Sequence, residues 1–408
     1  MKILFIHQNL PAQFATLMAH YARSNEHQVV GVTQRQSINS SDDSTHFGRV
    51  VAYQPKRHPS QNIHHYVYPF EASVLNGQAV AGALHHLKEE GFVPDIVYCH
   101  PSWGEGLYVK DMLPKAKLLA YCEFYYRAHG QDCDFDPEFP ITLDDELRVR
   151  TRNATHLLTL EACDLGVSPT NWQRSTHPSA FRPKIRVIHE GVDTFRAVPK
   201  PNGIFVLPNG TALSSRSEVI TYTNRSLEPH RGFHRFMRAL PEILRRRPNC
   251  QVVITGEDTV LYGQLLQEGD SWKQRMLREI DVDPNRVHFL GMLPWREHIQ
   301  LLQVSTVHVY LTVPFVLSWS ILEAMSVGAA VVGSDTAPVR DVIQHEKNGL
   351  LVDYFDQQQL VDAIVAVCNR PRLRGQLGKA ARDTVVGRFD VSKSIAEYDA
   401  LFRCTVGS

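Results

Sequence analysis

Short apolar runs alternate with amphipathic segments along the first half of this 408-residue chain. Short runs of apolar residues indicate buried strands, and apolar residues spaced by three or four indicate helices. The strands expected there are Ile3 to Ile6, His27 to Val32, Asp95 to Cys99, Lys117 to Tyr121, Leu157 to Leu160 and Ile185 to Ile188, with helices at Ala12 to Arg23, Gly77 to Glu90 and Gly104 to Leu113. Such alternation predicts a parallel sheet with helices on both faces.

The pattern breaks over residues 197–217, where proline, glycine and serine are frequent, and this segment is predicted to be a linker. Alternation then resumes. The strands expected in the second half are Val219 to Tyr222, Gln251 to Thr255, Val287 to Leu290 and Val307 to Leu311, with helices at Phe233 to Arg246, within Trp272 to Ile280, and at Arg296 to Gln303, Ser320 to Val327, Gln357 to Val367, Arg372 to Val386 and Val391 to Phe402.

The length of the chain suits two domains, since single cores seldom grow this large. We expect an N-terminal domain over residues 1–196, a C-terminal domain over residues 218–386, and a last helical segment, 387–408, that is free to pack back on the N-terminal domain. Two doubly wound domains imply a cleft between them, with ligands at the carboxyl ends of the strands.

The composition is that of an ordinary globular protein, with 43% hydrophobic and 21% charged residues. The 43 basic and 43 acidic side chains cancel, so no bulk positive charge favours nucleic acid as a partner.

Seven scattered cysteines without a Cys-x-x-Cys pair are typical of reduced thiols. The apolar run after Met1 is too short for a signal peptide, and no run is long enough to span a membrane. We therefore expect a cytoplasmic protein, with attachment at the inner face of the membrane and the oligomeric state left open.

The segment from Val307 to Met325 has the pattern of an anion site. An apolar strand leads through Phe315, Leu317 and Ser318 into a helix that begins near Ser320. Unpaired backbone N–H groups and the positive end of the helix dipole at such a start suit a diphosphate. The spacing of Ser320 and Glu323 equally fits an ordinary capping box, so the pattern alone leaves both interpretations open.

The stretch Ser320 to Gly328 resembles the second half of the Glu-x7-Glu motif of the retaining family 4 glycosyltransferases. The resemblance implies that Glu323 accepts hydrogen bonds from the ribose of a nucleotide-sugar donor, a task for which a carboxylate is suited. Phe315, Ser318, Trp319 and Ser320 become further candidate donor-binding residues. The first glutamate of the motif is replaced here by Phe315, which puts the contact to the donor sugar in question.

Further segments extend this resemblance. Arg225 and Arg231, which precedes Gly232, occupy the places of two basic residues that bind the donor's diphosphate in the family, and a guanidinium grips phosphate through two hydrogen bonds. In the strand and loop from Val287 onward, Gly291 and Met292 correspond to the family's contact with the base. Other resembling segments are Val187 to Asp193, Gly333 to Asp335 and Asn348 to Val352.

The N-terminal half of such enzymes binds the acceptor, and the resemblance is looser there. The candidate acceptor-binding residues are Gln13 and Phe14, which follow the first strand, and His100, which follows the strand that ends at Cys99, as a histidine does in the family. Glu123 follows the strand from Lys117, where many relatives carry a histidine near the reacting sugar. We take Glu123 as a candidate catalytic carboxylate on the acceptor side; the alternative is a charged residue that starts a loop.

The loop from Asp132 to Asp136 contains Asp-x-Asp repeats, which hold a metal in a different transferase fold. An EF-hand is excluded, because Pro137 and Leu143 stand where glycine and glutamate are needed. The usual hydrolase, kinase and dinucleotide motifs are absent from the sequence.

Together these patterns and the resemblance imply a GT-B-like α/β fold of two Rossmann-like domains. They imply a retaining, metal-independent glycosyltransferase without a cofactor, in which a nucleotide-sugar is the donor and a glycan or lipid-linked molecule the acceptor. Arg225 and Arg231 would stabilise the departing diphosphate. A nucleotide-sugar epimerase of the same architecture and a non-catalytic sugar-nucleotide-binding protein remain as alternatives.

Overall fold

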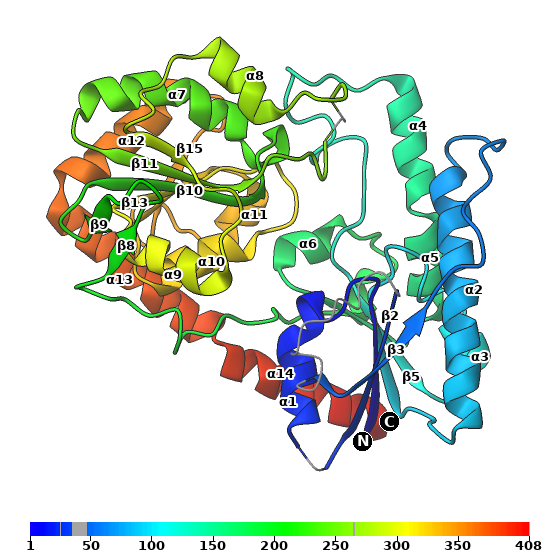
Figure 1. Ribbon diagram of the computed structural model, residues 1–408. Helices are drawn as coiled ribbons and strands as arrows, with labels where there is room; N and C mark the ends of the chain where they lie inside the picture. Colours follow the sequence, from blue (N-terminus) through cyan, green and yellow to red (C-terminus); the bar gives the residue numbers. More distant parts are fainter. Residues whose placement is uncertain (25, 35–46, 264–265, 408) are drawn as a thin grey trace. The chain divides into compact units, whose positions relative to one another are not determined.

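A computed structural model describes residues 1–24, 26–34, 47–263 and 266–407. The chain forms two compact units (Figure 1). The first consists of Met1–Gly191 together with the C-terminal segment that starts at Val391, and the second is Val192–Asp390. The boundaries therefore lie at 191 and 390, five and four residues from those expected, and the first unit is built from two separate parts of the sequence.

The first unit is built on a parallel sheet of seven strands in the order β3-β2-β1-β4-β5-β6-β7. The strands are β1 (Lys2–Ile6), β2 (Gln28–Gln34), β3 (Arg49–Tyr53), β4 (Ile96–Cys99), β5 (Lys117–Tyr121), β6 (Leu165–Ser168) and β7 (Ile185–Val187). The order reverses between β1 and β4, whose Ile3 and Ile96 are paired in register. Loops that leave these two strands diverge at their carboxyl ends, where ligands bind in doubly wound sheets.

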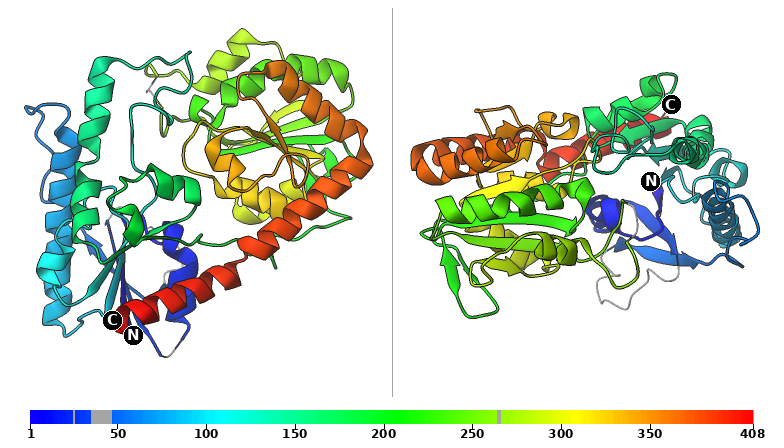
Figure 2. Two further views of the ribbon diagram at one scale, coloured as in Figure 1. Left: turned by 180° about the vertical axis from the view of Figure 1, so that it is seen from behind. Right: turned by 90° about the horizontal axis from the view of Figure 1, so that it is seen from above.

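Helices cover both faces of this sheet. They are η1 (Ala12–Phe14), α1 (Ala15–Ala22), α2 (Tyr68–Glu89), α3 (Val109–Met112), α4 (Leu143–Arg152), α5 (Ala154–Ala162), α6 (Asn171–Thr176), η4 (Arg182–Lys184) and α14 (Val391–Gly407). Helices α2 and α5 supply one apolar cluster. Helices α1 and α14 supply the other and lie side by side (Figures 1 and 2), with the rings of Tyr21 and Phe402 stacked at 5.6 Å.

The second unit has a parallel sheet of six strands in the order β12-β11-β10-β13-β14-β15. They are β10 (Val219–Ser226), β11 (Gln251–Glu257), β12 (Val287–Phe289), β13 (Val307–Tyr310), β14 (Val331–Ser334) and β15 (Leu350–Val352). The order reverses between β10 and β13. This is the same arrangement as in the first unit, with a switch point at the centre of the sheet.

The helices of the second unit are η5 (Pro229–Arg231), α7 (Phe233–Arg246), α8 (Trp272–Glu279), α9 (Trp295–Gln303), α10 (Trp319–Ser326), α11 (Ala337–Arg340), α12 (Gln357–Asn369) and α13 (Pro371–Arg388). Helices α7 and α12 lie on one side of the sheet, and α9, α10 and α13 lie on the other (Figure 1). In α7 the buried positions Phe233, Phe236, Met237 and Leu240 recur at helical spacing, which explains why the expected helix has the observed bounds.

The predicted linker, residues 197–217, is instead part of the second unit. It contains the antiparallel hairpin of β8 (Ile204–Val206) and β9 (Ala212–Ser214). Phe205 and Leu213 are buried against Val253 and Leu301 of the same unit. The prolines and glycines that indicated a linker belong to the turns around this hairpin. The apolar residues between them are what fold the segment onto the second unit.

The expected strand Leu157 to Leu160 is also wrong, because these residues belong to α5. A short apolar run has the same pattern in a buried helix and in a buried strand. Here Thr155, His156, Thr159 and Leu160 are buried at helical spacing. Within the described ranges, none of the helices combines the length and the apolar character needed to cross a lipid bilayer.

Burial of His308 on β13 makes the second unit sensitive to acid. Its side chain is inaccessible to solvent and its Nδ1 lies 3.0 Å from Thr221 Oγ1. Burial lowers the pKa of His308 from 6.5 to about 3, so the ring is neutral in the folded protein. The unfolded chain binds a proton below its own pKa near 6.5, so stability falls as the pH decreases below that value. At pH 5 this one group costs about 2 kcal/mol.

We expect the His308→Asn variant to lose less unfolding free energy between pH 7 and pH 5 than the wild-type protein, by about 2 kcal/mol. Urea denaturation at the two pH values measures this difference. His58 is exposed, and His58→Asn serves as the control that should keep the wild-type pH dependence. Equal losses in wild type and His308→Asn would contradict the assignment.

Candidate functional site

In the second unit, the segments that leave β10 and β13 meet at the switch point of the sheet. Gly232, with φ +66°, forms the turn between η5 and α7, and a Cβ at this position would lie 2.4 Å from Leu311 Cβ. The close approach therefore requires glycine. It brings Arg231 next to the residues that follow β13.

The guanidinium of Arg231 is buried and directed at the segment after β13. Its Nη1 donates to Val316 O at 2.8 Å and to Thr312 Oγ1 at 3.1 Å. The rings of Tyr262 and Phe315 each lie 5.6 Å from the guanidinium carbon. A planar cation held by two fixed acceptors and two rings has little freedom, so its remaining N–H groups are preorganised.

Phe315, which stands where a glutamate was expected, is a packing residue. Its side chain is 3% exposed, and its ring lies 4.9 Å from that of Tyr262 and 5.7 Å from that of His230. The Tyr262 segment is held by Glu228, whose Oε2 accepts from the backbone N–H groups of residues 262 and 263. Phe315 therefore contributes to the wall around Arg231 and has no polar group to offer a sugar.

Helix α10 starts at the end of this segment, and its cap differs from the capping box considered above. Ser318 is the N-cap, and its Oγ accepts from Ser320 N at 3.4 Å. The hydroxyls of Ser318 and Ser320 lie 3.1 Å apart, and Ser318 N donates to Tyr310 Oη at 2.8 Å. The capping-box interpretation of Glu323 is wrong, since the helix begins two residues earlier and Glu323 lies beyond its first turn.

The carboxylate of Glu323 is bound by side chains of α9. Oε1 accepts from Trp295 Nε1 at 2.7 Å, and Oε2 lies 3.1 Å from His298 Nε2. Helix α9 is preceded by the loop that contains Gly291 and Met292, and Met292 is 51% exposed. The structure thus brings the expected base-binding loop and the expected ribose-binding carboxylate to the start of one helix.

Two further candidates on this unit, besides Gly291 and Met292, lie at the surface. Arg225 is exposed on β10 one residue before the strand ends, and Trp319 is 44% exposed at the first position of α10. Both are available to a ligand, whereas Arg231 and Phe315 are buried. The donor-side candidates therefore include both buried residues, such as Arg231 and Phe315, and exposed residues, such as Arg225 and Trp319.

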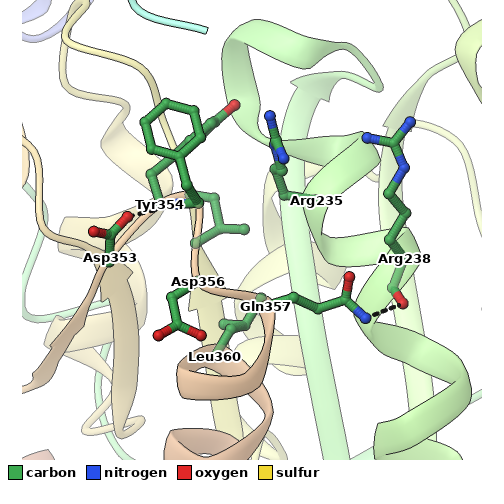
Figure 3. Close-up of a pocket in the computed structure, with 9 residues that line it drawn as sticks. Arg235, Arg238, Asp353, Tyr354, Asp356, Gln357 and Leu360 are labelled. Carbon is green, nitrogen blue, oxygen red and sulfur yellow. Dashed lines mark hydrogen bonds between the residues drawn. The ribbon is translucent and has the colours of Figure 1, made fainter. Parts of the chain in front are cut away.

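A small pocket of about 40 Å³ lies beside the start of α7 and α12 (Figure 3). Arg235 and Arg238 extend from α7, and Asp353 and Asp356 come from the connection between β15 and α12. Gln357 Nε2 donates to Arg238 O at 2.9 Å. A volume of this size holds only about three water molecules, so the pocket cannot enclose a nucleotide.

In the first unit, three of the acceptor-side candidates meet at the carboxyl ends of β1, β4 and β5. Glu123 Oε1 accepts from Gln13 Nε2 at 3.0 Å, and His100 Nε2 lies 3.5 Å from Glu123 Oε2. Burial raises the pKa of Glu123, but the contacts with His100 and Gln13 outweigh it and hold the pKa below its ordinary value. The Glu123 side chain is 31% exposed, so an ionised carboxylate faces solvent at this edge.

Phe14 does not belong to this group. It is 1% exposed and packs against Phe5, Tyr98 and Tyr121 in the core of the first unit. The helical turn η1 directs Gln13 toward Glu123 and turns Phe14 inward. As an acceptor contact, Phe14 is therefore wrong, and its role is to fix the turn that carries Gln13.

Sequence reasoning missed His7 and Trp103, which complete this edge. The rings of His7 and His100 lie 5.0 Å apart, and Trp103 stacks on His100 at 4.6 Å. Burial, followed by the nearby His100, lowers the pKa of His7 to about 3. His7 directly follows β1, as His100 directly follows β4. This shared position after neighbouring strands could have identified His7 as a site residue from the sequence.

Two carboxylates of the Asp132 to Asp136 loop accept hydrogen bonds from nearby backbone N–H groups. Asp134 accepts from Gly130 N at 3.0 Å, and Asp136 accepts from Glu138 N at 3.1 Å. His129 Nδ1 lies 3.2 Å from Asp134. These bonds give the aspartates a role in shaping the loop.

Two family models match consecutive parts of the chain. Residues 25–197 match the model described as Glycosyl transferase family 4 group, and residues 208–384 match Glycosyl transferases group 1. The junction between the two matches lies close to the boundary between the two structural units. Arg225, Arg231, Glu323 and the other donor-side candidates all fall within the second match.

Several mannosyltransferases are similar in sequence. The GDP-mannose-dependent alpha-(1-6)-phosphatidylinositol monomannoside mannosyltransferase of Mycolicibacterium smegmatis is 28% identical over 52% of this chain and 55% of that enzyme. The match thus spans little more than half of this relative. The enzyme of the same name from Mycobacterium tuberculosis is 25% identical over 87% of this chain and 84% of its own length.

Solved structures share the fold of the whole chain. HepE of Anabaena, solved in complex with UDP-glucose, has a TM-score of 0.68 at 17% identity and covers 99% of this chain and 100% of its own. Sucrose-phosphate synthase of Thermosynechococcus elongatus has a TM-score of 0.70 at 17% identity, with 99% and 98% covered. These likenesses confirm the predicted pair of Rossmann-like domains. With both family models matched in order, the chain belongs to the glycosyltransferases of the GT-B fold, with a family 4 group domain followed by a group 1 domain.

Proposed function

We propose that this protein transfers a sugar from a nucleotide-sugar donor, bound by the second unit, to a glycan or lipid-linked acceptor bound by the first. The observation that carries the proposal is the arrangement after β10 and β13. Arg231, which follows β10, donates to Thr312 and Val316, which lie between β13 and the start of α10. A buried cation and a helix start, which follow neighbouring strands, suit the diphosphate of such a donor. The match of this unit to the group 1 model supports the same assignment.

Each donor-side residue is assigned a part of the nucleotide-sugar that suits its charge and hydrogen-bonding groups. Arg231, exposed Arg225 and the N–H groups at the start of α10 stabilise the negative charge that grows on the diphosphate as the glycosidic bond breaks. Ser318 and Ser320 offer hydroxyls to the same group. Glu323 accepts hydrogen bonds from the ribose hydroxyls, and Gly291 and Met292 contact the base. Transfer proceeds with retention of configuration, as the resemblance to the retaining family 4 enzymes implies. It needs no metal, because the positive charges of Arg225 and Arg231 take the metal's place.

On the acceptor side, Glu123 is the carboxylate that faces the incoming hydroxyl. Gln13 and His100 hold it in its ionised form, in which it accepts a hydrogen bond from that hydroxyl. The names of the mannosyltransferase relatives include a phosphatidylinositol-linked substrate, which favours an acceptor in or near a membrane. We propose a role in building cell-surface polysaccharide or glycolipid at the cytoplasmic face of the membrane.

A screen of nucleotide-sugars by thermal shift tests the proposal. GDP-mannose and UDP-glucose are tried first, because GDP-mannose dependence is named for the relatives and UDP-glucose occupies the HepE structure. ADP-sugars complete the set. A ligand that binds only the folded state raises the melting temperature, by an amount that grows with its concentration. If no nucleotide-sugar raises it, the donor site assigned here does not exist.

A nucleotide-sugar that binds is then incubated with the protein, with and without an oligosaccharide or polyprenyl-linked acceptor. Release of nucleoside diphosphate that depends on the acceptor supports transfer. Conversion of the sugar without any acceptor would instead identify an epimerase. An unchanged rate in EDTA supports metal-independent transfer.

A further inference from the structure

Both oxygens of the Glu323 carboxylate contact side chains of α9, and this arrangement has a consequence for donor recognition. We infer that Trp295 and His298 are positioning residues that fix Glu323 in the orientation needed to accept both ribose hydroxyls. The inference rests on the proposed function, in which Glu323 binds the ribose of a nucleotide-sugar.

The two donors lie on one face of α9. Trp295 is the first residue of the helix and His298 follows three positions later, a spacing that places two side chains on the same side. Trp295 Nε1 lies 2.7 Å from Oε1 of Glu323, and His298 Nε2 lies 3.1 Å from Oε2. Each oxygen therefore receives its own donor, and rotation of the carboxylate about its last bond would break both contacts.

The hydrogen-bonding capacity of Glu323 leaves room for the substrate. An ionised carboxylate offers about four acceptor positions, of which α9 occupies two. The other two, one on each oxygen, suit two vicinal hydroxyl groups. A glutamate without the two donors would have to lose its rotamer freedom on binding, and fixing it beforehand removes that cost.

Trp295 is itself held in place. The guanidinium of Arg196 lies 4.4 Å from the centre of its ring. The ring is 36% exposed, so it forms part of the surface beside the loop of Gly291 and Met292. Replacing Trp295 by phenylalanine removes the N–H donor and keeps an aromatic, though smaller, ring for Arg196, which makes Trp295→Phe the most conservative test of the donor.

The experiment compares binding of ribose and 2′-deoxyribose nucleotides. UDP, GDP and ADP and their 2′-deoxy forms are titrated into the wild-type protein by calorimetry, and the base that binds is kept. We expect the wild type to prefer the ribose form by about tenfold or more, since the lost hydrogen bond is made to a charged acceptor. Trp295→Phe and His298→Leu should each reduce this preference about three- to tenfold and leave the affinity for the deoxy form almost unchanged.

Two further variants separate positioning from general damage. His298→Gln keeps an N–H donor and should retain most of the ribose preference. Trp172→Phe changes a partly buried tryptophan of the first unit and should keep the wild-type preference. In a Glu323→Ala background the Trp295→Phe change should have no further effect on the preference, because its effect passes through that carboxylate.

The outcomes distinguish this inference from the proposed function. If none of the nucleotides binds the wild type, the donor site itself is refuted and the inference with it. If the wild type binds a nucleotide without preferring ribose, Glu323 does not read the hydroxyls and the inference is overturned. A wild-type preference that survives fully in both Trp295→Phe and His298→Leu overturns the inference alone.

Discussion

Replacing Arg231 by alanine is expected to slow sugar transfer by about 10²- to 10³-fold, the largest effect of any single change considered for this protein. The diphosphate gains negative charge as the sugar leaves, and Arg231 is the buried cation fixed between the ends of β10 and β13. Its partners Thr312 and Val316 hold it rigidly, so its interaction with the leaving group strengthens without reorganisation. The loss should fall on kcat, measured as nucleoside diphosphate released at saturating donor.

The controls for Arg231 address folding and charge. Arg231→Lys keeps the positive charge but loses the planar fork, and an intermediate rate is expected. Arg245→Ala removes an exposed arginine from the adjacent helix α7, where it contacts Glu242, and should transfer at the wild-type rate. Because Arg231 also donates to Thr312 and Val316, the melting temperature of each variant is measured beside its rate. A folded Arg231→Ala variant with wild-type kcat would show that the arginine has no part in leaving-group departure.

Replacing Glu323 by alanine is expected to raise the KM for the donor by about 10- to 100-fold, with a smaller change in kcat. The ribose hydroxyls lose their charged acceptor, and water replaces part of it in the variant. The expected net loss is therefore that of about one such hydrogen bond, about 1.5–3 kcal/mol, which corresponds to about 10- to 100-fold. The ribose is remote from the bond that breaks, so the interaction contributes to binding in the ground state and the transition state alike. Initial rates over a range of donor concentrations separate the two constants.

Glu323→Gln tests whether the charge or the shape of this side chain matters. The amide oxygen can still accept from Trp295, but the amide nitrogen cannot accept from His298, so a KM between those of wild type and Glu323→Ala is expected. Glu297→Gln on the neighbouring helix α9 is the matched control, since Glu297 is exposed. Donor KM values for Glu323→Ala within twofold of the wild-type value would contradict the ribose assignment.

The fold could be predicted from the sequence wherever apolar positions were strongly periodic. Helix α7 and strand β5 have the bounds expected from their patterns. Strand β6, Leu165–Ser168, was missed because its glycine and serine interrupt an already short apolar run. The hairpin of β8 and β9 was missed because prolines and glycines were given more weight than Phe205 and Leu213, whose burial depends on partners far away in the sequence.

The sequence indicated which residues to consider for the candidate site, but not which side chains those residues contact. Arg231 and Glu323 could be selected because they fall within motifs, but the motifs carry no information about their partners. Trp295 and His298 meet Glu323 only because α9 packs beside α10, and that contact is a product of the tertiary fold. The packing role of Phe315 likewise depends on Tyr262, which is brought to it by the carboxylate of Glu228.

Helix α14 belongs to the first unit but follows the whole of the second unit in the sequence. Tyr398 and Phe402 complete the apolar cluster of that unit, and Tyr398 Oη lies 3.1 Å from Tyr98 Oη. During synthesis the second unit, Val192–Asp390, therefore emerges in full before the first can close its core. The first unit therefore cannot reach its final packing until the whole of the second has been synthesised, and the aromatic side chains that α14 covers, such as Tyr98, lack that cover until then.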